Sequence, residues 1–461
     1  MEYKYFKICF INKIIKYLFF IFITFFIAIY LNNIQITNKI INQNYLQIQN
    51  ENNISFDNRI KRRINIGIYA FGIKNGGRAR STSLMINYFK KIKIFNLCLF
   101  TRRSKEKNEY KIPVNIKRML VKNDLICKIK KSKVHILIYQ LSTHKEINQL
   151  NNLNDIKVIF YQHLGIFDWI YGNYTIFKLL YRYYQYSKYV INIVPFENYY
   201  IFKKWGINSI FMNNFMTYDY TKILESDLST RRILMIGRGD AKKKRFEIGI
   251  KAMEYINYEI PQSELIIISD LIGILRHEIL INNLNLFNII KLVGYIASPE
   301  IYYNNASLNL FPSISEAFPL VMCETKIYGI PSILLGLDYT SISKGGTIII
   351  YDEYPESLAK VSINILKNKN YRNNLGKIAR KSMRIFNNDL LLKKWTKLIL
   401  SINNGHYYYN SLREIDIELS HNNLLNIIKN QIYLLKKRIP IFKNISNNEF
   451  ENFSFMENVI I

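Results

Sequence analysis

Residues 311–331 read Phe-Pro-Ser-Ile-Ser-Glu-Ala-Phe-Pro-Leu-Val-Met-Cys-Glu-Thr-Lys-Ile-Tyr-Gly-Ile-Pro, and this stretch carries most of the information on the fold. An apolar strand end at 308–311 runs into a Pro-Ser turn, and a helix is expected to begin near Pro319, where a missing N–H costs nothing. Glu316 precedes this helix, and Glu324 lies roughly one and a half turns into it. A strand, a turn and a helix N-terminus together form a site for an anion such as a diphosphate, and carboxylates beside it suit sugar hydroxyls.

The segment resembles the signature of retaining glycosyltransferases of family 4, in which two Glu residues separated by seven others stand in a Glu-x-Phe-Gly/Pro context. Glu316 and Glu324 have this spacing, and Gly329-Ile330-Pro331 matches the Gly-x-Pro that ends the motif. The resemblance covers about residues 64–402, closely over 232–360 and loosely before. It implies an α/β chain with the GT-B fold, in which two doubly wound Rossmann-like domains face a cleft.

Apolar segments alternate with helical ones in the first half of the chain. Ile64–Phe71 is expected to be a buried strand and Ala79–Lys91 a helix. Further strand-like runs lie at 94–100, 134–139, 158–161 and 189–194. This alternation predicts a parallel, doubly wound sheet whose ligands bind at the carboxyl ends of the strands. We therefore expect an N-terminal Rossmann-like domain at 63–220, which the resemblance makes the acceptor domain.

Two features of this domain lie directly after predicted strands. Gly76-Gly77 lets backbone amides approach a ligand closely, although such turns also occur for geometry alone. His163 follows the strand at 158–161, where a packed or surface imidazole is the alternative to a functional one. The resemblance places Gly76 and Gly77 where donor phosphate and acceptor meet, and it makes His163 a catalytic residue that contacts the transferred sugar.

A second Rossmann-like domain, for the nucleotide-sugar, is expected at 230–385. Gly237-Arg238 follows the predicted strand 232–236, and the cationic run Lys242–Arg245 comes shortly after. Arg grips a diphosphate with a planar fork and Lys acts on it as a point charge, whereas a solvated basic loop is the alternative. The resemblance assigns donor binding to Arg238 and Lys244, with Lys243 as the alternate because the spacing is slightly longer than in the family.

The resemblance also assigns roles around the signature. Glu316 would sit near the sugar as a catalytic residue, and Glu324 would hold the two ribose hydroxyls. Phe318, Leu320 and Val321 would contact the donor at the start of the helix. The chain contains no Asp-x-Asp, the motif that usually holds the metal in the other large glycosyltransferase fold. We therefore expect no metal and no cofactor, with a UDP- or GDP-linked sugar as the donor substrate.

Composition bounds the remaining possibilities. The chain has 461 residues, 49% of them hydrophobic, and a formal net charge of +30. Its abundance of Ile, Asn, Lys and Tyr resembles AT-rich coding, so the charge is weak evidence for a nucleic-acid partner, and none is expected. None of the four cysteines forms a Cys-x-x-Cys pair, and pairing of Cys98 with Cys127 is left open.

The N-terminus predicts a membrane anchor. Residues 17–31, YLFFIFITFFIAIYL, are apolar apart from Thr24, lysines precede them, and no small-x-small cleavage site follows. We expect a cytosolic segment (1–16), a signal-anchor transmembrane helix (17–31) and a spacer (32–62) in a single-pass type II protein of the endoplasmic reticulum or Golgi. A cleaved signal or a buried helix is the alternative. A helix at 386–402 would cross back to the first domain, and 403–461 would be a tail.

The expected activity is glycosyl transfer with retention, from a nucleotide-diphosphate sugar to a hydroxyl of a glycan, lipid-linked or protein acceptor. One alternative within the same fold is a sugar-nucleotide epimerase or hydrolase, which turns over donor without an acceptor. The other is a non-catalytic, membrane-tethered carbohydrate-binding protein with a degenerate site. The joint presence of Glu316, Glu324, Arg238 and a nearby lysine argues against such decay.

Overall fold

The structure, a computed structural model, describes residues 63–405 and six residues between 429 and 437. Its gaps are at 75, 108, 141–149, 151–152, 154, 167–183, 185–186, 196, 198–205, 208, 239–241, 297 and 343–344. The predicted anchor (17–31), the spacer and nearly all of the predicted tail lie outside the described residues. Within the described part of the chain, every helix is too short or too polar to span a bilayer.

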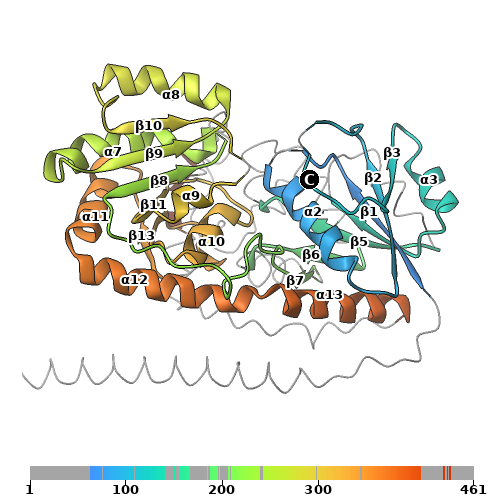
Figure 1. The fold of residues 1–461 in the computed structure, drawn as a ribbon. Coiled ribbons are helices and arrows are strands. Elements are labelled where there is room, and N and C mark those ends of the chain that lie inside the picture. Colours follow the sequence, from blue (N-terminus) through green and yellow to red (C-terminus); the bar gives the residue numbers. More distant parts are fainter. Residues whose placement is uncertain are drawn as a thin grey trace, which may run out of the picture. The chain divides into compact units, whose positions relative to one another are not determined.

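A seven-stranded sheet forms the first lobe, with the strand order β3-β2-β1-β4-β5-β6-β7 and every neighbouring pair parallel (Figure 1). Its strands are β1 (Ile64–Ala70), β2 (Phe95–Thr101), β3 (Lys117–Leu120), β4 (Ile136–Tyr139), β5 (Lys157–Gln162), β6 (Tyr189–Asn192) and β7 (Ser209–Phe211). The helices α2 (Gly76–Phe89) and α3 (Leu125–Lys131) belong to the same lobe.

The strands of this sheet are nearly continuous runs of Ile, Leu, Val, Phe and Tyr. All four residues of β4 are buried, as expected for a parallel strand covered on both faces. The edge strand β3 was not predicted, because its sequence Lys-Arg-Met-Leu has no apolar run and none of its side chains is buried. Hydrophobicity therefore identifies the central strands and misses this edge.

The second lobe is built on a six-stranded parallel sheet with the order β10-β9-β8-β11-β12-β13. Its strands are β8 (Arg232–Ile236), β9 (Glu264–Ile268), β10 (Ile290–Val293), β11 (Leu308–Phe311), β12 (Ser332–Leu335) and β13 (Thr347–Ile350). Its helices are η3 (Lys242–Lys244), α7 (Phe246–Glu259), α8 (Leu271–Asn283), α9 (Glu300–Tyr303), α10 (Leu320–Ile327), η4 (Asp338–Ile342), α11 (Pro355–Lys367), α12 (Lys369–Ser382) and η5 (Met383–Phe386). Two parallel Rossmann-like sheets confirm the predicted α/β class.

The last long helix, α13 (Asn388–Asn403), returns to the first lobe (Figure 1). Its fully buried Trp395 packs edge-on against Phe89 of α2 and Tyr161 of β5, with ring centroids 5.5 Å and 5.3 Å apart. The Asn388 amide also donates to the Tyr88 hydroxyl at 2.7 Å. A chain that leaves the second sheet is thus fixed to the core of the first, and both sheets belong to one compact unit that begins at Arg63.

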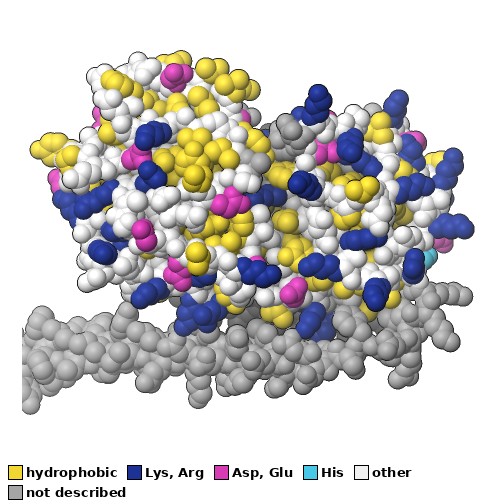
Figure 2. Space-filling view, viewed as in Figure 1, with side chains coloured by type: hydrophobic (Ala, Val, Ile, Leu, Met, Phe, Trp, Pro, Cys, Tyr) yellow, Lys and Arg dark blue, Asp and Glu magenta, His cyan; other side chains and the backbone are white. Residues whose placement is uncertain are grey.

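The surface carries its positive charge in a dispersed form. Figure 2 shows Lys and Arg side chains scattered over the face in view, between apolar and acidic ones. This spread gives no support to a nucleic-acid surface on this face. Cys98 and Cys127 are free thiols, so the disulfide that the sequence left open does not form between them.

Candidate active site

Each sheet has one point where the strand order reverses direction. The first sheet places β1 between β2 and β4, and the second places β8 between β9 and β11. Ligands of doubly wound sheets bind outside the carboxyl ends of the strands at such points. Every residue assigned to the site from the sequence follows the carboxyl end of a strand: β1 for Gly76, β5 for His163, β8 for Arg238 and β11 for Glu316.

The signature forms the start of α10, as predicted. Pro319 occupies the N-cap and Leu320 is the first helical residue, one position after the predicted start. Phe318 and Leu320 are buried and Val321 is partly buried, so backbone amides are the polar groups that this turn offers a ligand. We call the segment that joins β1 to Gly76 and Gly77 the glycine loop. A Cβ placed on Gly77 would lie 3.9 Å from Leu320 Cδ1, so the end of this loop lies beside the start of α10.

Lys244 and Glu316 form an ion pair across the second lobe's reversal point. Lys244 ends η3, after β8, and Glu316 follows β11; both side chains are largely buried. The Lys244 stem runs over Gly237, where an added Cβ would lie 3.3 Å from the lysine Cε. The Ile314 N–H donates to the Lys243 carbonyl at 2.9 Å, which ties the two loops together. The turn directs Lys244 to the carboxylate, and the choice of Lys244 over Lys243 for donor binding stays a prediction.

Arg238, the other predicted donor cation, lies directly after β8 with an exposed side chain. It precedes residues 239–241, which lie outside the described part of the chain. The structure therefore brings Lys244 and Glu316 into contact and leaves Arg238 at the surface of the same loop. Its role in donor binding stays a prediction.

Glu324 is 1% exposed, and both of its oxygens have partners. Oε1 accepts a hydrogen bond from the Thr217 hydroxyl at 2.8 Å and pairs with Arg80 Nη1 at 2.9 Å. Oε2 accepts from the Tyr303 hydroxyl at 3.0 Å. Arg80 stands one turn into α2 of the first lobe, so this ion pair joins the two lobes.

The three partners of Glu324 were not found from the sequence. Burial tends to lower the pKa of Arg80, but the neighbouring carboxylate and tyrosines raise it to a value above the ordinary one. The pKa of Tyr303 is raised well above its ordinary value by burial and by Glu324, so Tyr303 stays a hydroxyl donor. One feature of the sequence pointed to Arg80: it lies one turn after Gly76-Gly77. Residues three or four positions apart on a helix lie on the same face, so Arg80 is expected near whatever the Gly-Gly turn contacts.

His163 lies at the carboxyl end of β5 and is buried against Tyr161, with ring centroids 4.2 Å apart. Burial and the positive charge of Arg78 lower the pKa of His163 to about 3, so the imidazole is neutral at physiological pH. Its Nε2 has no hydrogen-bond partner among the described residues. The neutral ring therefore presents an unused polar atom on the side of the sheet where ligands bind.

Gln140, at the end of β4, is a second buried side chain with an unused polar atom. Its Oε1 lies 2.6 Å from the Thr82 hydroxyl of α2, and its Nε2 finds no partner in the part of the chain that the structure describes. Unpaired buried polar atoms are rare in folded proteins and point to a missing ligand or water. Gln140 was not predicted, because in sequence it is only one polar residue after an apolar strand.

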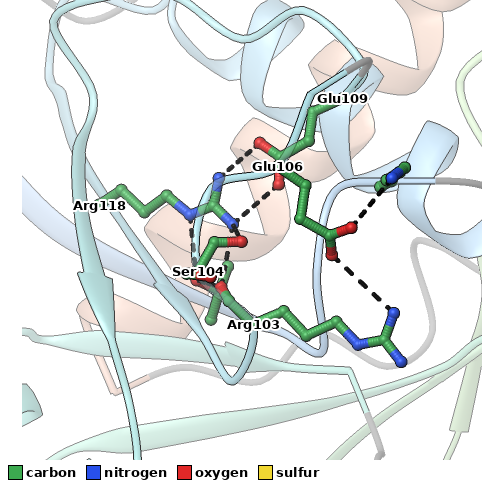
Figure 3. A network of polar contacts seen from close by, with 7 residues as sticks. Arg103, Ser104, Glu106, Glu109 and Arg118 are labelled. Atoms are coloured by element: carbon green, nitrogen blue, oxygen red, sulfur yellow. Dashed lines mark hydrogen bonds and ion pairs between the residues drawn. The ribbon is translucent and has the colours of Figure 1, made fainter.

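The glycine loop is held by the segment that follows β2. Figure 3 shows Arg118 of β3 bound to both oxygens of Glu109, at 2.6 Å and 3.1 Å. The same guanidinium donates to the Arg103 carbonyl at 3.1 Å. Glu106 in turn pairs with Lys74 of the glycine loop at 3.0 Å. This network fixes the loop before Gly76 relative to the sheet.

His163 predicts a pH-dependent stability. Because the folded pKa of about 3 lies below the ordinary value, the unfolded chain binds more protons between the two values, and stability falls as pH falls through this window. Between pH 6.5 and pH 5 the loss is about 2 kcal/mol in the free energy of unfolding. Urea unfolding at both pH values should show this loss in the wild type, and His163→Gln should remove it. An equal loss in both proteins would contradict the assignment.

The described residues contain no group of three or more His, Cys, Asp or Glu side chains arranged to hold a metal ion. The groups that gather at the site are instead cations, carboxylates, hydroxyls and helix N-termini. Such an arrangement can bind an anion together with a polyhydroxylated ligand.

Comparisons with known proteins agree with this picture. Residues 219–382 match the family model described as glycosyl transferases group 1, a stretch that contains the whole second sheet. Sucrose-phosphate synthase from Thermosynechococcus elongatus has a similar structure, with 17% identity, a TM-score of 0.62, and coverage of 74% of this chain and 100% of that chain. A glycosyltransferase from Rickettsia africae is also similar, with 15% identity, a TM-score of 0.59, and coverage of 75% and 100%.

HepE from Anabaena, solved in complex with UDP and glucose, is a third similar structure. It shows 14% identity and a TM-score of 0.60, and the match covers 74% of this chain and 100% of that chain. No curated protein sequence matches the chain. At these identities the structural likeness establishes the fold, and the match to the family model is limited to residues 219–382, which hold the second sheet.

Proposed function

We propose that the protein is a retaining glycosyltransferase of family 4, which moves a sugar from a nucleotide-diphosphate sugar to an acceptor hydroxyl. The observation that carries this proposal is the meeting of three elements at the start of α10: the glycine loop, the Lys244–Glu316 pair and the signature turn. These elements follow the carboxyl ends of β1, β8 and β11, and the topology brings these strand ends together. The combination suits a pyrophosphate with a sugar attached.

Positive charge at the site would stabilise the leaving group. As the anomeric bond breaks, negative charge grows on the diphosphate, and preorganised donors lower the barrier. Lys244 and Arg238 supply cations on the second lobe. A Cβ on Gly77 would lie 3.9 Å from Leu320 Cδ1, so the N-termini of α2 and α10 are close together and their positive dipole ends would add to this charge. These groups act without a metal ion in this proposal.

Retention would proceed by attack on the same face that the diphosphate leaves. The transition state has oxocarbenium character at the anomeric carbon, and the departing phosphate takes the proton of the acceptor hydroxyl. Glu316 is ion-paired with Lys244, which suits a carboxylate that binds sugar hydroxyls rather than one that attacks carbon. The anomeric configuration of the product, read by NMR, tests this step, and an inverted product would refute it.

The first lobe would bind the acceptor and the far side of the transferred sugar. Neutral His163 and Gln140 present unused polar atoms there, and both suit hydrogen bonds to hydroxyls. A His with a pKa of about 3 does not act as an acid at neutral pH, so its role here is to bind and orient. Similar structures of HepE hold UDP-glucose, and one of TarM holds UDP with an α-GlcNAc-glycerol.

By this analogy the donor would be a UDP-sugar, and the sequence leaves a GDP-sugar as the alternative. The acceptor would be a glycan, lipid-linked or protein acceptor. We also propose, from the sequence of residues 1–62, that an N-terminal anchor holds the enzyme as a type II protein in the endoplasmic reticulum or Golgi. Neither metal nor cofactor would be needed.

Nucleotide binding gives the direct test of the proposed function. A nucleoside diphosphate at 100 times its Kd should stabilise the protein by about 2.7 kcal/mol, measured as a rise in Tm across a panel of UDP, GDP, ADP and their sugars. The shift should persist in EDTA. Lys244→Met should reduce it, while Lys128→Met on α3 should not. No shift with any nucleotide would overturn the proposal, and sugar release without acceptor at the full rate would favour a hydrolase.

A further inference from the structure

The ion pair between Arg80 and Glu324 joins the two lobes at the residue predicted to hold the ribose. Arg80 Nη1 lies 2.9 Å from Glu324 Oε1, and the contact comes from α2 of the first lobe. We propose, on the basis of the proposed function, that Arg80 is a positioning residue whose guanidinium competes with the donor ribose for the Glu324 carboxylate. Donor binding would then require Arg80 to leave this carboxylate.

The hydrogen-bonding capacity of Glu324 supports the competition. Each carboxylate oxygen accepts about two hydrogen bonds. Among the described residues, Oε1 has Thr217 and Arg80 as partners, whereas Oε2 has Tyr303 alone, which leaves one place. A ribose presents two hydroxyl donors to the two oxygens. One partner on Oε1 therefore has to leave before both hydroxyls are bound.

Of the two partners on Oε1, Arg80 has a long side chain with many rotamers and Thr217 a short one, so Arg80 is the partner that moves. The Glu324 side chain is 1% exposed, so a ligand reaches it only when a neighbour gives way. Tyr303 is fully buried in α9, and its ring packs 5.0 Å from that of Tyr328. Arg80 is 19% exposed, carries a long flexible side chain, and belongs to the other lobe. Its departure opens the carboxylate without disturbing the second lobe's core.

The first turns of α2 and α10 approach each other at two points. Gly77 is beside Leu320, and Arg80, one turn further, is beside Glu324. Releasing the ion pair therefore loosens the contact between these two helix ends. In this way occupancy of the donor site changes how firmly the first lobe, which would bind the acceptor, is held to the second.

The test uses a nucleoside rather than a nucleotide, because a nucleoside carries the ribose without the phosphate charges that attract Arg80 directly. The probe is uridine or guanosine, whichever base the nucleotide panel selects. Arg80→Met should bind it at least threefold more tightly than the wild type in competition calorimetry, and Arg80→Lys should stay near the wild type. Arg232→Met, which breaks an Arg–Glu pair of 2.8 Å at the amino ends of β8 and β9, should leave the affinity unchanged.

Two further measurements guard against a variant that simply fails to fold. Urea unfolding of Arg80→Met should show a cooperative transition, which establishes that the variant is folded. In a Glu324→Gln background, Arg80→Met should give no further gain. Unchanged or weaker nucleoside binding in Arg80→Met would overturn the inference even when nucleoside diphosphates bind, whereas a wild type that binds no nucleotide overturns the proposed function itself.

Discussion

Lys244→Met is expected to lower kcat for sugar transfer by about 10²- to 10³-fold, the usual effect of removing one preorganised group that stabilises developing charge. Lys244 is largely buried, paired with Glu316, and held over Gly237. Methionine keeps the stem and removes the ammonium, so the loop between β8 and α7 should keep its shape. The loss should appear in kcat more than in the acceptor KM, because the diphosphate gains its charge in the transition state.

Lys243→Met is the matched control for this experiment. Both lysines belong to η3, but the Lys243 backbone carbonyl, not its side chain, accepts the Ile314 hydrogen bond that ties the loops together. Its substitution should change kcat by less than roughly threefold, below the scale of one lost charge contact. Equal losses in the two variants would assign the effect to the loop as a whole, and a loss confined to Lys243→Met would move the catalytic role to that residue.

The sequence predicts the two sheets because their strands are buried on both faces and therefore read as apolar runs. Strands such as β4 and β11 are buried at every position. Their apolar sequence therefore predicts a strand without information on the strands that pair with them. The edge strand β3 is different, because its pairing with β2 depends on the backbone and its side chains remain polar or half exposed. Local composition carries no signal for such a strand.

The residues of the candidate site also fall into two groups, those that a local motif predicts and those that only the fold reveals. Glu316, Glu324 and Lys244 were predicted because they belong to one motif and to the loop after β8. Arg80 is far from Glu324 in sequence, on the other lobe, and only the fold brings the two side chains together. Gln140 was missed for a related reason: its meaning comes from an unpaired atom that only the fold reveals.

Substitution of Glu324 is expected to have the second large effect on transfer. The choice of the new residue decides whether the loss reports on stability or on donor binding. Alanine removes the acceptor of Thr217 and Tyr303 and leaves Arg80 without this carboxylate. Breaking a buried ion pair from one side typically costs about 3 kcal/mol or more, so Glu324→Ala should lower the free energy of unfolding by that order. Loss of transfer in this variant would therefore mix unfolding with chemistry, and urea unfolding has to accompany the assay.

Glu324→Gln separates the two effects. The amide keeps an oxygen for Thr217 or Tyr303 and nearly the same volume, but it removes the charge that strengthens hydrogen bonds to the ribose hydroxyls. Two weakened charged hydrogen bonds amount to about 2–3 kcal/mol, which predicts a fall of roughly 30- to 150-fold in kcat/KM for the donor. Glu264→Gln, at the amino end of β9, should keep wild-type transfer. Wild-type donor kinetics in a folded Glu324→Gln protein would show that this carboxylate serves the contact between the lobes and does not hold the nucleotide.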